Sequence, residues 1–260
     1  MRIICFAKQV PNPEIPSAVR IEGNQAVPAA GVPQVINGFD ENAIEAALRI
    51  KAKNQATVTV ISLAKEHSLD VVKKPLSMGC DELILLQDPS FEDGDAYSIA
   101  AALAAAVKKA GQFDLILCGR QASDTDRGQV GAAVAELLGL PAVTLAKSVE
   151  VTESTVQVER VLADGTEVVE APLPALVTVS NELGEPRYPT LRGIMAAGRK
   201  TPTIWKAADI GLDPTQSARV VTRAKLFIPE KHKQVEWVTG DTPAVAARNL
   251  ALKLRQAKLI

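Results

Sequence analysis

The feature that most constrains the fold is an alternation of short apolar runs with stretches of helical periodicity, which continues from the N-terminus to about residue 146. The apolar runs have the length and composition of buried strands and cover residues 2–7, 57–61, 82–86, 114–118 and 142–145. The helical stretches cover residues 40–53, 67–78, 93–110 and 130–138. Because the connections leave room only for βαβ crossovers, the alternation predicts a doubly wound, mostly parallel α/β sheet with helices on both faces.

Residue types near the ends of these elements predict local geometry. Asn37-Gly38 is a turn signal, and Asp40 is placed to cap the helix that follows. Pro75 is expected to interrupt or end the helix predicted at residues 67–78. Three prolines within residues 8–16 predict an extended loop there rather than a helix.

From residue 149 the pattern changes to short strands joined by turns. These strands cover residues 149–151, 155–161 and 166–170, with a turn at Ala163-Asp164-Gly165. Val156 and Val158 alternate with polar neighbours, which is typical of an antiparallel ribbon with one buried face. A last apolar strand is expected at residues 175–180.

The C-terminal segment contains apolar residues but little regular periodicity. Residues 201–241 include Trp205, Phe227 and Trp237, which such a segment cannot bury by itself. It is either an arm that packs on a partner protein or an irregular cover over the chain's own sheet. An amphipathic helix follows at residues 243–258. We therefore expect a main domain over residues 1–200 and an extended C-terminal arm, ending in a helix, over residues 201–260.

The composition argues against several classes of function. The 260 residues carry a net charge of −1, which disfavours nucleic acid or an anionic membrane as the main partner. Aromatic residues make up only 3%, so base-stacking platforms are not expected. No apolar run reaches the roughly 18 residues of a membrane span, and the N-terminus lacks the pattern of a signal peptide.

The cysteines and histidines favour a protein of the cytoplasm that holds no metal. Cys5, Cys80 and Cys118 lie far apart in apolar surroundings without CxxC spacing, which predicts buried, reduced thiols. His67 and His232 offer no cluster of metal ligands.

Residues 119–131, GRQASDTDRGQVG, form a loop between a predicted strand and a predicted helix. In that order, a glycine-bearing loop places free backbone N–H groups where a phosphate can bind. The loop exceeds the ~2–6 residues typical of such a connection, and long loops tend to be functional. The other interpretation is an ordinary connection that binds nothing, since GxGxxG, GxSxG and P-loop patterns are absent.

Residues 181–200, NELGEPRYPTLRGIMAAGRK, form a second informative segment. Two prolines stiffen the chain, and a helix can begin after the second of them. Its apolar face is flanked by basic residues, a layout that suits transient docking onto an acidic or apolar groove. The alternative is a surface helix whose leucine faces the core. The candidate docking residues are Arg187, Tyr188, Leu191, Ile194 and Met195.

Five segments match the signature of one known family. Three are VERVLAD at 158–164, PALVT at 174–178 and the segment at 181–200. The loop GRQASDTDRGQVG matches the family's GKQAxDxDxxQxG, with Arg120 in place of lysine, and NGFDENAIEAALRIK at 37–51 also fits. Together they make the chain resemble the beta subunit of electron transfer flavoproteins over nearly its whole length.

The resemblance implies a Rossmann-like subunit of a heterodimer whose alpha subunit holds the redox-active FAD. The beta subunit would enclose one side of that FAD and bind AMP structurally in its own domain. Leu191 would anchor a docking dehydrogenase, and residues 201–260 would pack on the alpha subunit. The implied AMP contacts are Phe6, Asn37, Gly38, Phe39, Asp40, Ser62, Gly119, Arg120, Gln121, Ala122, Ser123, Asp124, Thr125, Asp126, Arg127, Gly128, Gln129 and Val130.

The implied function is electron transport by a carrier subunit rather than an enzyme. Electrons would pass from an acyl-CoA-type or other flavin dehydrogenase, as in fatty acid oxidation, to a quinone-linked or other acceptor protein. One alternative is an electron-bifurcating member with a second FAD in the AMP site, although such members typically carry a DGDTAQVGP-like loop where this chain has DTDRGQVGA. An alternative of another class is a nucleotide-hydrolysing or adenylating α/β enzyme in which Asp124 and Asp126 hold Mg²⁺.

Overall fold

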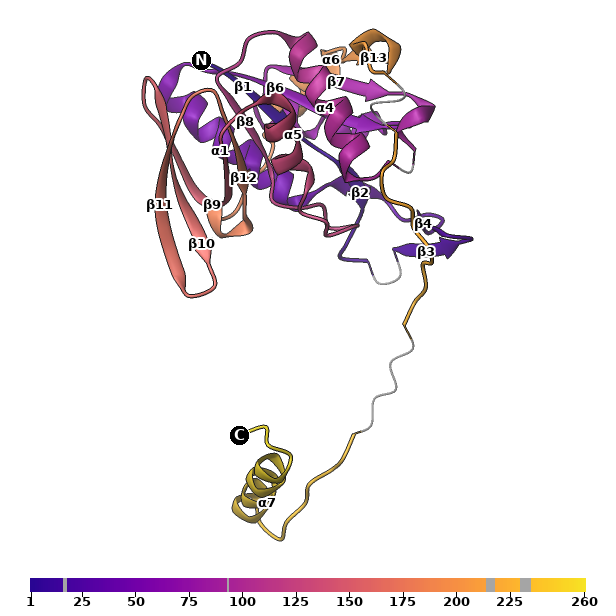
Figure 1. Cartoon of the computed structure of the whole chain (residues 1–260), viewed down its shortest axis with the longest axis vertical. Helices are drawn as coiled ribbons and strands as arrows, with labels where there is room; N and C mark the ends of the chain where they lie inside the picture. Colours follow the sequence, from indigo (N-terminus) through magenta and orange to yellow (C-terminus); the bar gives the residue numbers. More distant parts are fainter. Residues whose placement is uncertain (16–17, 93, 214–217, 230–234) are drawn as a thin grey trace. The chain divides into compact units, whose positions relative to one another are not determined.

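The core of the protein is one mixed β-sheet. The computed structural model describes residues 1–15, 18–92, 94–213, 218–229 and 235–260. The strands of the sheet are β1 (Arg2–Phe6), β6 (Thr57–Ala64), β7 (Glu82–Gln87), β8 (Leu115–Gly119), β9 (Ala142–Val151), β10 (Thr155–Leu162), β11 (Gly165–Pro172), β12 (Ala175–Val179) and β13 (Thr203–Trp205). Within the described ranges, these nine strands have the order β11-β10-β9-β12-β8-β1-β6-β7-β13 (Figure 1).

The remaining elements are two small antiparallel pairs and the helices. The pairs are β2 (Gln9–Pro11) with β5 (Gln34–Ile36) and β3 (Val19–Glu22) with β4 (Gln25–Pro28). The α-helices are α1 (Gly38–Asn54), α2 (Leu69–Val72), α3 (Lys74–Met78), α4 (Ala96–Ala110), α5 (Val130–Leu138), α6 (Leu191–Arg199) and α7 (Pro243–Gln256). The part of the chain that the structure describes also contains three short 3₁₀ turns, η1 (Pro89–Phe91), η2 (Asn181–Leu183) and η3 (Ala208–Ile210).

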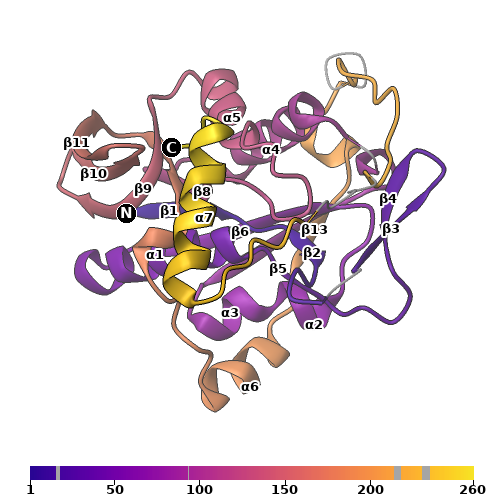
Figure 2. The same cartoon turned by 90° about the horizontal axis from the view of Figure 1, so that it is seen from below.

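The predicted doubly wound, mostly parallel sheet is confirmed. β1 pairs in parallel with both β6 and β8, and β12 pairs in parallel with β8. Helices α1 and α3 pack on one face, while α4 and α5 pack on the other (Figure 2). The chain builds the sheet outward from β1 in one direction through β6 and in the other through β8. The strand order therefore reverses between β1 and β8, which is where open α/β sheets bind ligands.

The predicted antiparallel ribbon is also present, but its first strand is longer than expected. β9 runs unbroken over residues 142–151, where the sequence predicted separate strands at 142–145 and 149–151. Leu145 has a φ of 62°, and the register of β9 against β12 shifts nearby, so a bulge rather than a break separates the two halves. β10 buries Val156 and Val158, which gives the ribbon one apolar face.

The predicted cap of α1 is wrong. The helix begins at Gly38, and the carbonyl of Asn37 accepts hydrogen bonds from the N–H groups of Asp40 (2.9 Å) and Glu41 (3.0 Å). Asp40 therefore lies inside the first turn, and Asn37-Gly38 starts a helix instead of forming a separate turn. The Asp40 carboxylate is used elsewhere, as described below.

The helix predicted over residues 67–78 is divided into α2 and α3. The break falls at Lys73, and Pro75 lies in the first turn of α3. Proline has no N–H and is tolerated in a first turn, where that donor would have no intrahelical partner. Gly79 ends α3 with a φ of 127°, a conformation that favours glycine.

The chain divides into a compact unit over Met1–Leu226 and a second unit over Phe227–Ile260. The first unit extends beyond residue 200 because β13 pairs in parallel with β7 and adds a strand to the sheet. In the second unit, α7 begins after Thr242, whose hydroxyl accepts a hydrogen bond from the N–H of Val245 (3.3 Å). Parts of four predictions lie outside the described residues: Pro16, Asp93, His232 and the arm segments 214–217 and 230–234.

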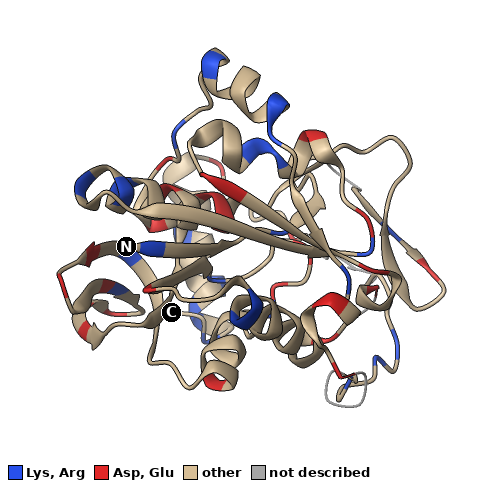
Figure 3. Ribbon diagram, turned by 90° about the horizontal axis from the view of Figure 1, so that it is seen from above, with Lys and Arg blue, Asp and Glu red and all other residues tan. Residues whose placement is uncertain are grey.

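The three cysteines are buried and free of disulfides, as the sequence predicted. Acidic and basic residues are interspersed along the described chain (Figure 3). In the ranges that the structure describes, no helix combines the length and apolar character needed to cross a membrane.

Candidate nucleotide pocket and docking segment

A pocket of about 330 Å³ lies at the carboxyl ends of β1, β6 and β8. Parallel neighbours end at the same edge of a sheet, so the end of β1, the start of α1 and the loop after β8 meet there. The predicted contact residues that line it are Phe6, Asn37, Asp40, Gly119, Arg120, Gln121, Ala122, Thr125, Arg127, Gly128, Gln129 and Val130.

Asn37 fastens the loop after β8 to the start of α1. Its Nδ2 donates to the carbonyl of Gln121 (2.8 Å), and its Oδ1 accepts from the N–H of Ser123 (3.1 Å). The N–H of Asn37 donates to the carbonyl of Lys8 (2.8 Å). The side chain is buried, so these bonds fix the loop's path rather than leave the amide free for a ligand.

Asp40 ties the ends of β1 and β8 together beneath the pocket. Its carboxylate accepts from the N–H of Lys8 (2.8 Å) and from the N–H of Gly119 (2.9 Å). Burial raises the pKa of Asp40 to about 6, although these hydrogen bonds and the charge of Lys8 act to lower it. The carboxyl group therefore titrates near neutral pH.

The loop requires glycine where it passes Asp40. A Cβ on Gly119 would lie 2.6 Å from Oδ1 of Asp40 and 2.7 Å from the backbone of Phe39. Further along, Asp126 and Gly128 have φ angles of 46° and 62°, in the left-handed region. Gly119 is therefore required where the loop passes close to Asp40 and Phe39, and Gly128 is required for a turn.

The two acids of the loop have separate partners. Asp124 forms an ion pair with the amine of Lys8 (2.7 Å), while Asp126 accepts from Nε2 of Gln121 (2.9 Å). Neither acid lines the pocket. They do not converge as the paired Mg²⁺ ligands that the nucleotide-hydrolysing alternative needs.

The pocket combines an apolar wall with several cations. The apolar side chains are Phe6, Ile61, Leu63, Phe91, Ile99 and Leu103. The cationic side chains are Lys8, Arg120, Arg127 and Arg223, and the lining carboxyl group is that of Asp40. An apolar surface suits a nucleobase, and guanidinium groups suit a phosphate.

Several polar groups in and around the loop lack a protein partner. Among the described residues, Nε of Arg120 and the hydroxyl of Ser123 are buried without a hydrogen bond. Such groups cost about 1–3 kcal/mol each when left unpaired. Gln129 also gives α5 no side-chain cap, which leaves N–H groups of its first turn for another acceptor. The residues present therefore fit an anionic ligand.

Six predicted contacts do not line the pocket: Gly38, Phe39, Ser62, Ser123, Asp124 and Asp126. The ring of Phe39 lies beneath the guanidinium of Arg120, 5.0 Å from its central carbon. Ser62 stands between two pocket-lining residues of β6, so strand alternation directs it to the opposite face. Its hydroxyl lies 3.2 Å from Nε2 of His67, and burial lowers the pKa of that histidine.

Sequence reasoning missed part of the lining. Lys8 directly follows β1, so the rule that ligands lie at the carboxyl ends of strands could have found it. Phe91, Ile99 and Leu103 look like ordinary core residues in the sequence. Arg223 comes from an irregular segment far along the chain and carries no signal of its own.

The candidate docking residues project from α6 and the turn before it. Thr190 begins the helix, with its hydroxyl accepting from the N–H of Gly193 (3.0 Å). Gly193 packs against the backbone of Ser77 on α3 so closely that a Cβ there would clash. The opposite side is solvent-exposed: Tyr188 is 89% and Leu191 75% exposed, and Ile194 and Met195 are also exposed.

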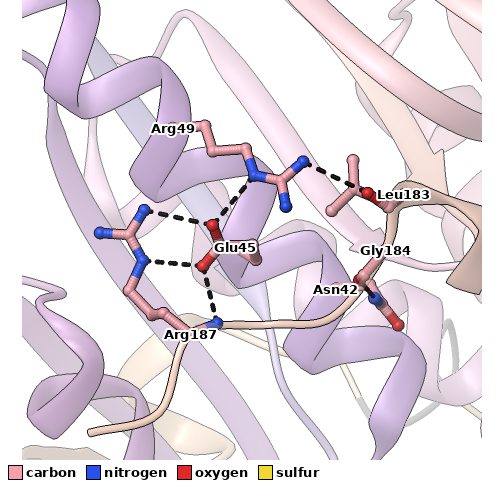
Figure 4. Close-up of polar contacts among 6 residues, drawn as sticks. All are labelled: Asn42, Glu45, Arg49, Leu183, Gly184 and Arg187. Carbon is pink, nitrogen blue, oxygen red and sulfur yellow. Dashed lines mark hydrogen bonds and ion pairs between the residues drawn. The ribbon is translucent and has the colours of Figure 1, made fainter.

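Arg187 differs from the other candidate docking residues because it is bound to α1 (Figure 4). Its Nε and Nη2 donate to the two carboxylate oxygens of Glu45 (2.7 and 3.2 Å), and its backbone N–H donates to the same group (3.1 Å). Arg49 also donates to Glu45 (2.9 Å). The guanidinium of Arg187 therefore holds the candidate docking segment, residues 181–200, in place.

Two further bonds fasten the same segment to α1. Asn42 donates to the carbonyl of Gly184 (2.8 Å), and Arg49 donates to the carbonyl of Leu183 (3.2 Å) (Figure 4). Asn42, Glu45 and Arg49 recur at three- and four-residue spacing, so one stripe of α1 makes these hydrogen bonds.

The fold defines a doubly wound α/β protein with a pocket at the point where its strand order reverses. A family model described as the electron transfer flavoprotein domain matches residues 26–210. The chain is 38% identical to the Caffeyl-CoA reductase-Etf complex subunit CarD of Acetobacterium woodii and 37% identical to the electron transfer flavoprotein subunit beta of Thermoanaerobacterium thermosaccharolyticum, each over the full length of both chains. It is 38% identical to the electron transfer flavoprotein subunit beta of Megasphaera elsdenii, with 88% of each chain covered. The chain belongs to the electron transfer flavoprotein family, as a beta subunit.

Proposed function

We propose that the pocket at the carboxyl edge of the sheet binds AMP as a structural nucleotide. The observation that carries this proposal is the combination of an apolar wall and four cationic side chains in one cavity of about 330 Å³. Ligand pockets range from roughly 300 to 1,000 Å³. A cavity at the lower end of that range fits a mononucleotide better than a dinucleotide.

AMP would satisfy groups that the protein leaves unpaired. Its phosphate can accept from Nε of Arg120 and from N–H groups at the start of α5. Its base can lie on the apolar wall that includes Phe6 and Ile61. Because buried unpaired donors are costly, the nucleotide would stabilise this part of the fold rather than react.

The second candidate is a FAD in the same place. A neighbouring pocket of about 270 Å³ shares Leu63, Phe91, Gly94 and Ile99 with the first, so the two adjoin. A dinucleotide could extend from one into the other. This observation supports the electron-bifurcating type of beta subunit.

The subunit would also enclose the FAD held by the alpha subunit and dock a dehydrogenase. The bound flavin would supply the electron transfer. The residues of this chain would bind the partner protein and orient it toward the flavin. Tyr188 and Leu191 offer an exposed apolar contact that suits a transient interface. The similarity to a subunit of a caffeyl-CoA reductase complex supports an oxidoreductase of CoA esters as the docking partner. A second redox protein, quinone-linked or other, would accept the electrons.

The nucleotide content of the purified complex tests this proposal. The chain would be coexpressed with its alpha subunit, and nucleotides released by denaturation would be quantified by chromatography. We expect one FAD and one AMP per heterodimer. Two FAD without AMP would favour the second candidate, and a single FAD with no other nucleotide would contradict both.

A further inference from the structure

A small group of residues, here called the partition, separates the two adjoining pockets. Among the described residues, those that line both pockets are Leu63, Phe91, Gly94 and Ile99. Residues that line two neighbouring cavities lie between them, so these residues divide one space from the other. Without the partition, a ligand in the larger pocket, of about 330 Å³, could also occupy the 270 Å³ of the smaller one.

Phe91 is the bulkiest member of the partition. Gly94 has no side chain, while Leu63 and Ile99 are aliphatic residues held by regular structure. Leu63 pairs with Leu86 in the sheet, and Ile99 lies on α4. The ring of Phe91 comes from the short turn η1 and packs against the apolar core beside α4 and α5. Its removal would open the partition without interrupting a strand of the sheet or an α-helix.

Hydrogen bonds fix the backbone that carries Phe91. Its N–H donates to the carbonyl of Asp88 (3.1 Å). The Asp88 carboxylate accepts from the N–H of Ser90 (2.9 Å) and from the hydroxyl of the same residue (2.8 Å). It also accepts from the N–H of Ala207 (3.3 Å), which lies 119 residues further along the chain. A ligand that spans both pockets would therefore have to displace the ring itself.

We propose that Phe91 determines the size of the nucleotide that this site accepts, an inference that rests on the proposed function. The ring leaves room for AMP in the larger pocket and blocks a dinucleotide from extending into the smaller one. Such specificity comes from a steric barrier against the larger ligand, not from an extra contact with the smaller one. A smaller side chain at position 91 should therefore favour FAD, while the cations of the larger pocket remain in place.

The test measures the nucleotides that each heterodimer retains. Wild type, Phe91→Ala, Phe91→Leu and Phe113→Ala would be purified with the alpha subunit, unfolded, and refolded with AMP and FAD in equal excess. Unbound nucleotide would be removed by gel filtration, and the bound nucleotide would be quantified by chromatography. Phe113→Ala is the matched control, because Phe113 packs against the same core cluster but lines neither pocket.

We expect the wild type and Phe113→Ala to hold one FAD and one AMP per heterodimer. In Phe91→Ala the ratio of FAD to AMP at the nucleotide site should rise at least about tenfold, because the barrier against the larger ligand is lost. This change appears as more than one FAD and less than one AMP per heterodimer. Phe91→Leu keeps part of the side chain and should shift by less in the same direction, and it decides the test if Phe91→Ala does not assemble.

The possible failures are distinguishable. If the wild type holds one FAD and one AMP and the Phe91 variants have the same content, the inference is wrong and the proposed function stands. An equal shift in Phe113→Ala would also overturn the inference, because a general loosening of the core would then be the cause. A wild type with two FAD would show that Phe91 does not exclude a dinucleotide, and it would remove the AMP proposal as well. A single FAD with no other nucleotide would overturn both.

Discussion

The carboxylate of Glu45 on α1 accepts three hydrogen bonds from Arg187, which lies 142 residues further along the chain (Figure 4). Burial acts to raise the pKa of Glu45, but the bonds from Arg187 and Arg49 outweigh it and lower the pKa below its usual value. Glu45 is therefore charged at neutral pH. It is the main polar link between the core and the segment that precedes the exposed residues of α6.

Replacing Glu45 should loosen this segment. Glu45→Gln keeps the size of the side chain but leaves two guanidinium groups beside a neutral amide. Because the Arg187 side chain is 42% exposed and partly screened by solvent, we expect a stability loss of only about 1 kcal/mol. The KM for the dehydrogenase should rise roughly fivefold with kcat nearly unchanged, since docking and not electron transfer is affected.

Glu150→Gln provides a matched control. It makes the same chemical change and removes an exposed ion pair to the same helix, between Glu150 and Lys53 (3.5 Å). Steady-state assays with saturating acceptor would compare the two variants. Equal KM values for both would show that the link to Arg187 does not position the docking segment.

Leu191→Ala should weaken dehydrogenase docking without destabilising the fold. The side chain is 75% exposed, so its removal should change the free energy of unfolding by less than about 0.5 kcal/mol. If Leu191 enters a pocket of the partner, the KM should rise about tenfold or more, as for a central interface contact. Leu69→Ala removes another exposed leucine, on α2, and should leave the KM unchanged. A normal KM for Leu191→Ala would contradict the docking role.

Asp40 should make stability depend on pH. Its pKa is raised from 3.8 to about 6 in the folded state, so the folded protein binds the proton more tightly than the unfolded chain does. This contribution to stability is complete below pH 4 and is lost as the pH rises to about 6. The loss amounts to about 3 kcal/mol, from 1.36 kcal/mol per pKa unit.

The variant Asp40→Asn isolates this effect because its side chain does not titrate. The midpoint of thermal unfolding of the heterodimer would be measured for wild type and variant between pH 5 and pH 7.5. We expect the variant to gain stability relative to the wild type as the pH rises. A difference that stays constant with pH would show that Asp40 does not titrate in this range.

Two glycines in helices should respond in opposite ways to alanine. A Cβ on Gly131 of α5 would lie 2.8 Å from Cγ2 of Thr178 and 2.9 Å from the sulfur of Cys118, so Gly131→Ala should cost about 1–3 kcal/mol. Gly198 of α6 has no atom within 4 Å of that position, so Gly198→Ala should stabilise by up to about 1 kcal/mol. Thermal unfolding of the two variants measures both effects, and a neutral Gly131→Ala would show that α5 can move away from the sheet.

Much of the architecture follows from local sequence patterns. The β-branched run at 57–61 and the alternation of Val156 and Val158 predict strands because burial on one or both faces leaves a periodic signature. The glycine-bearing loop after β8 indicates a ligand site because strand, loop and helix follow one another in the chain. The family could be recognised from such contiguous motifs alone.

The partners of individual side chains were decided by the tertiary structure. The sequence indicated a cap at Asp40 and a docking residue at Arg187, and the family resemblance implied a nucleotide contact at Ser62. The fold gives Asp40 two backbone donors from neighbouring strands, turns Ser62 to the opposite face of β6 and pairs Arg187 with Glu45. A polar group forms hydrogen bonds with donors or acceptors that lie within about 3 Å. The fold brings such partners together from positions that are distant in the sequence. The sequence therefore determined the elements and the edge where the pocket lies, while the packed structure determined which side chains reach it.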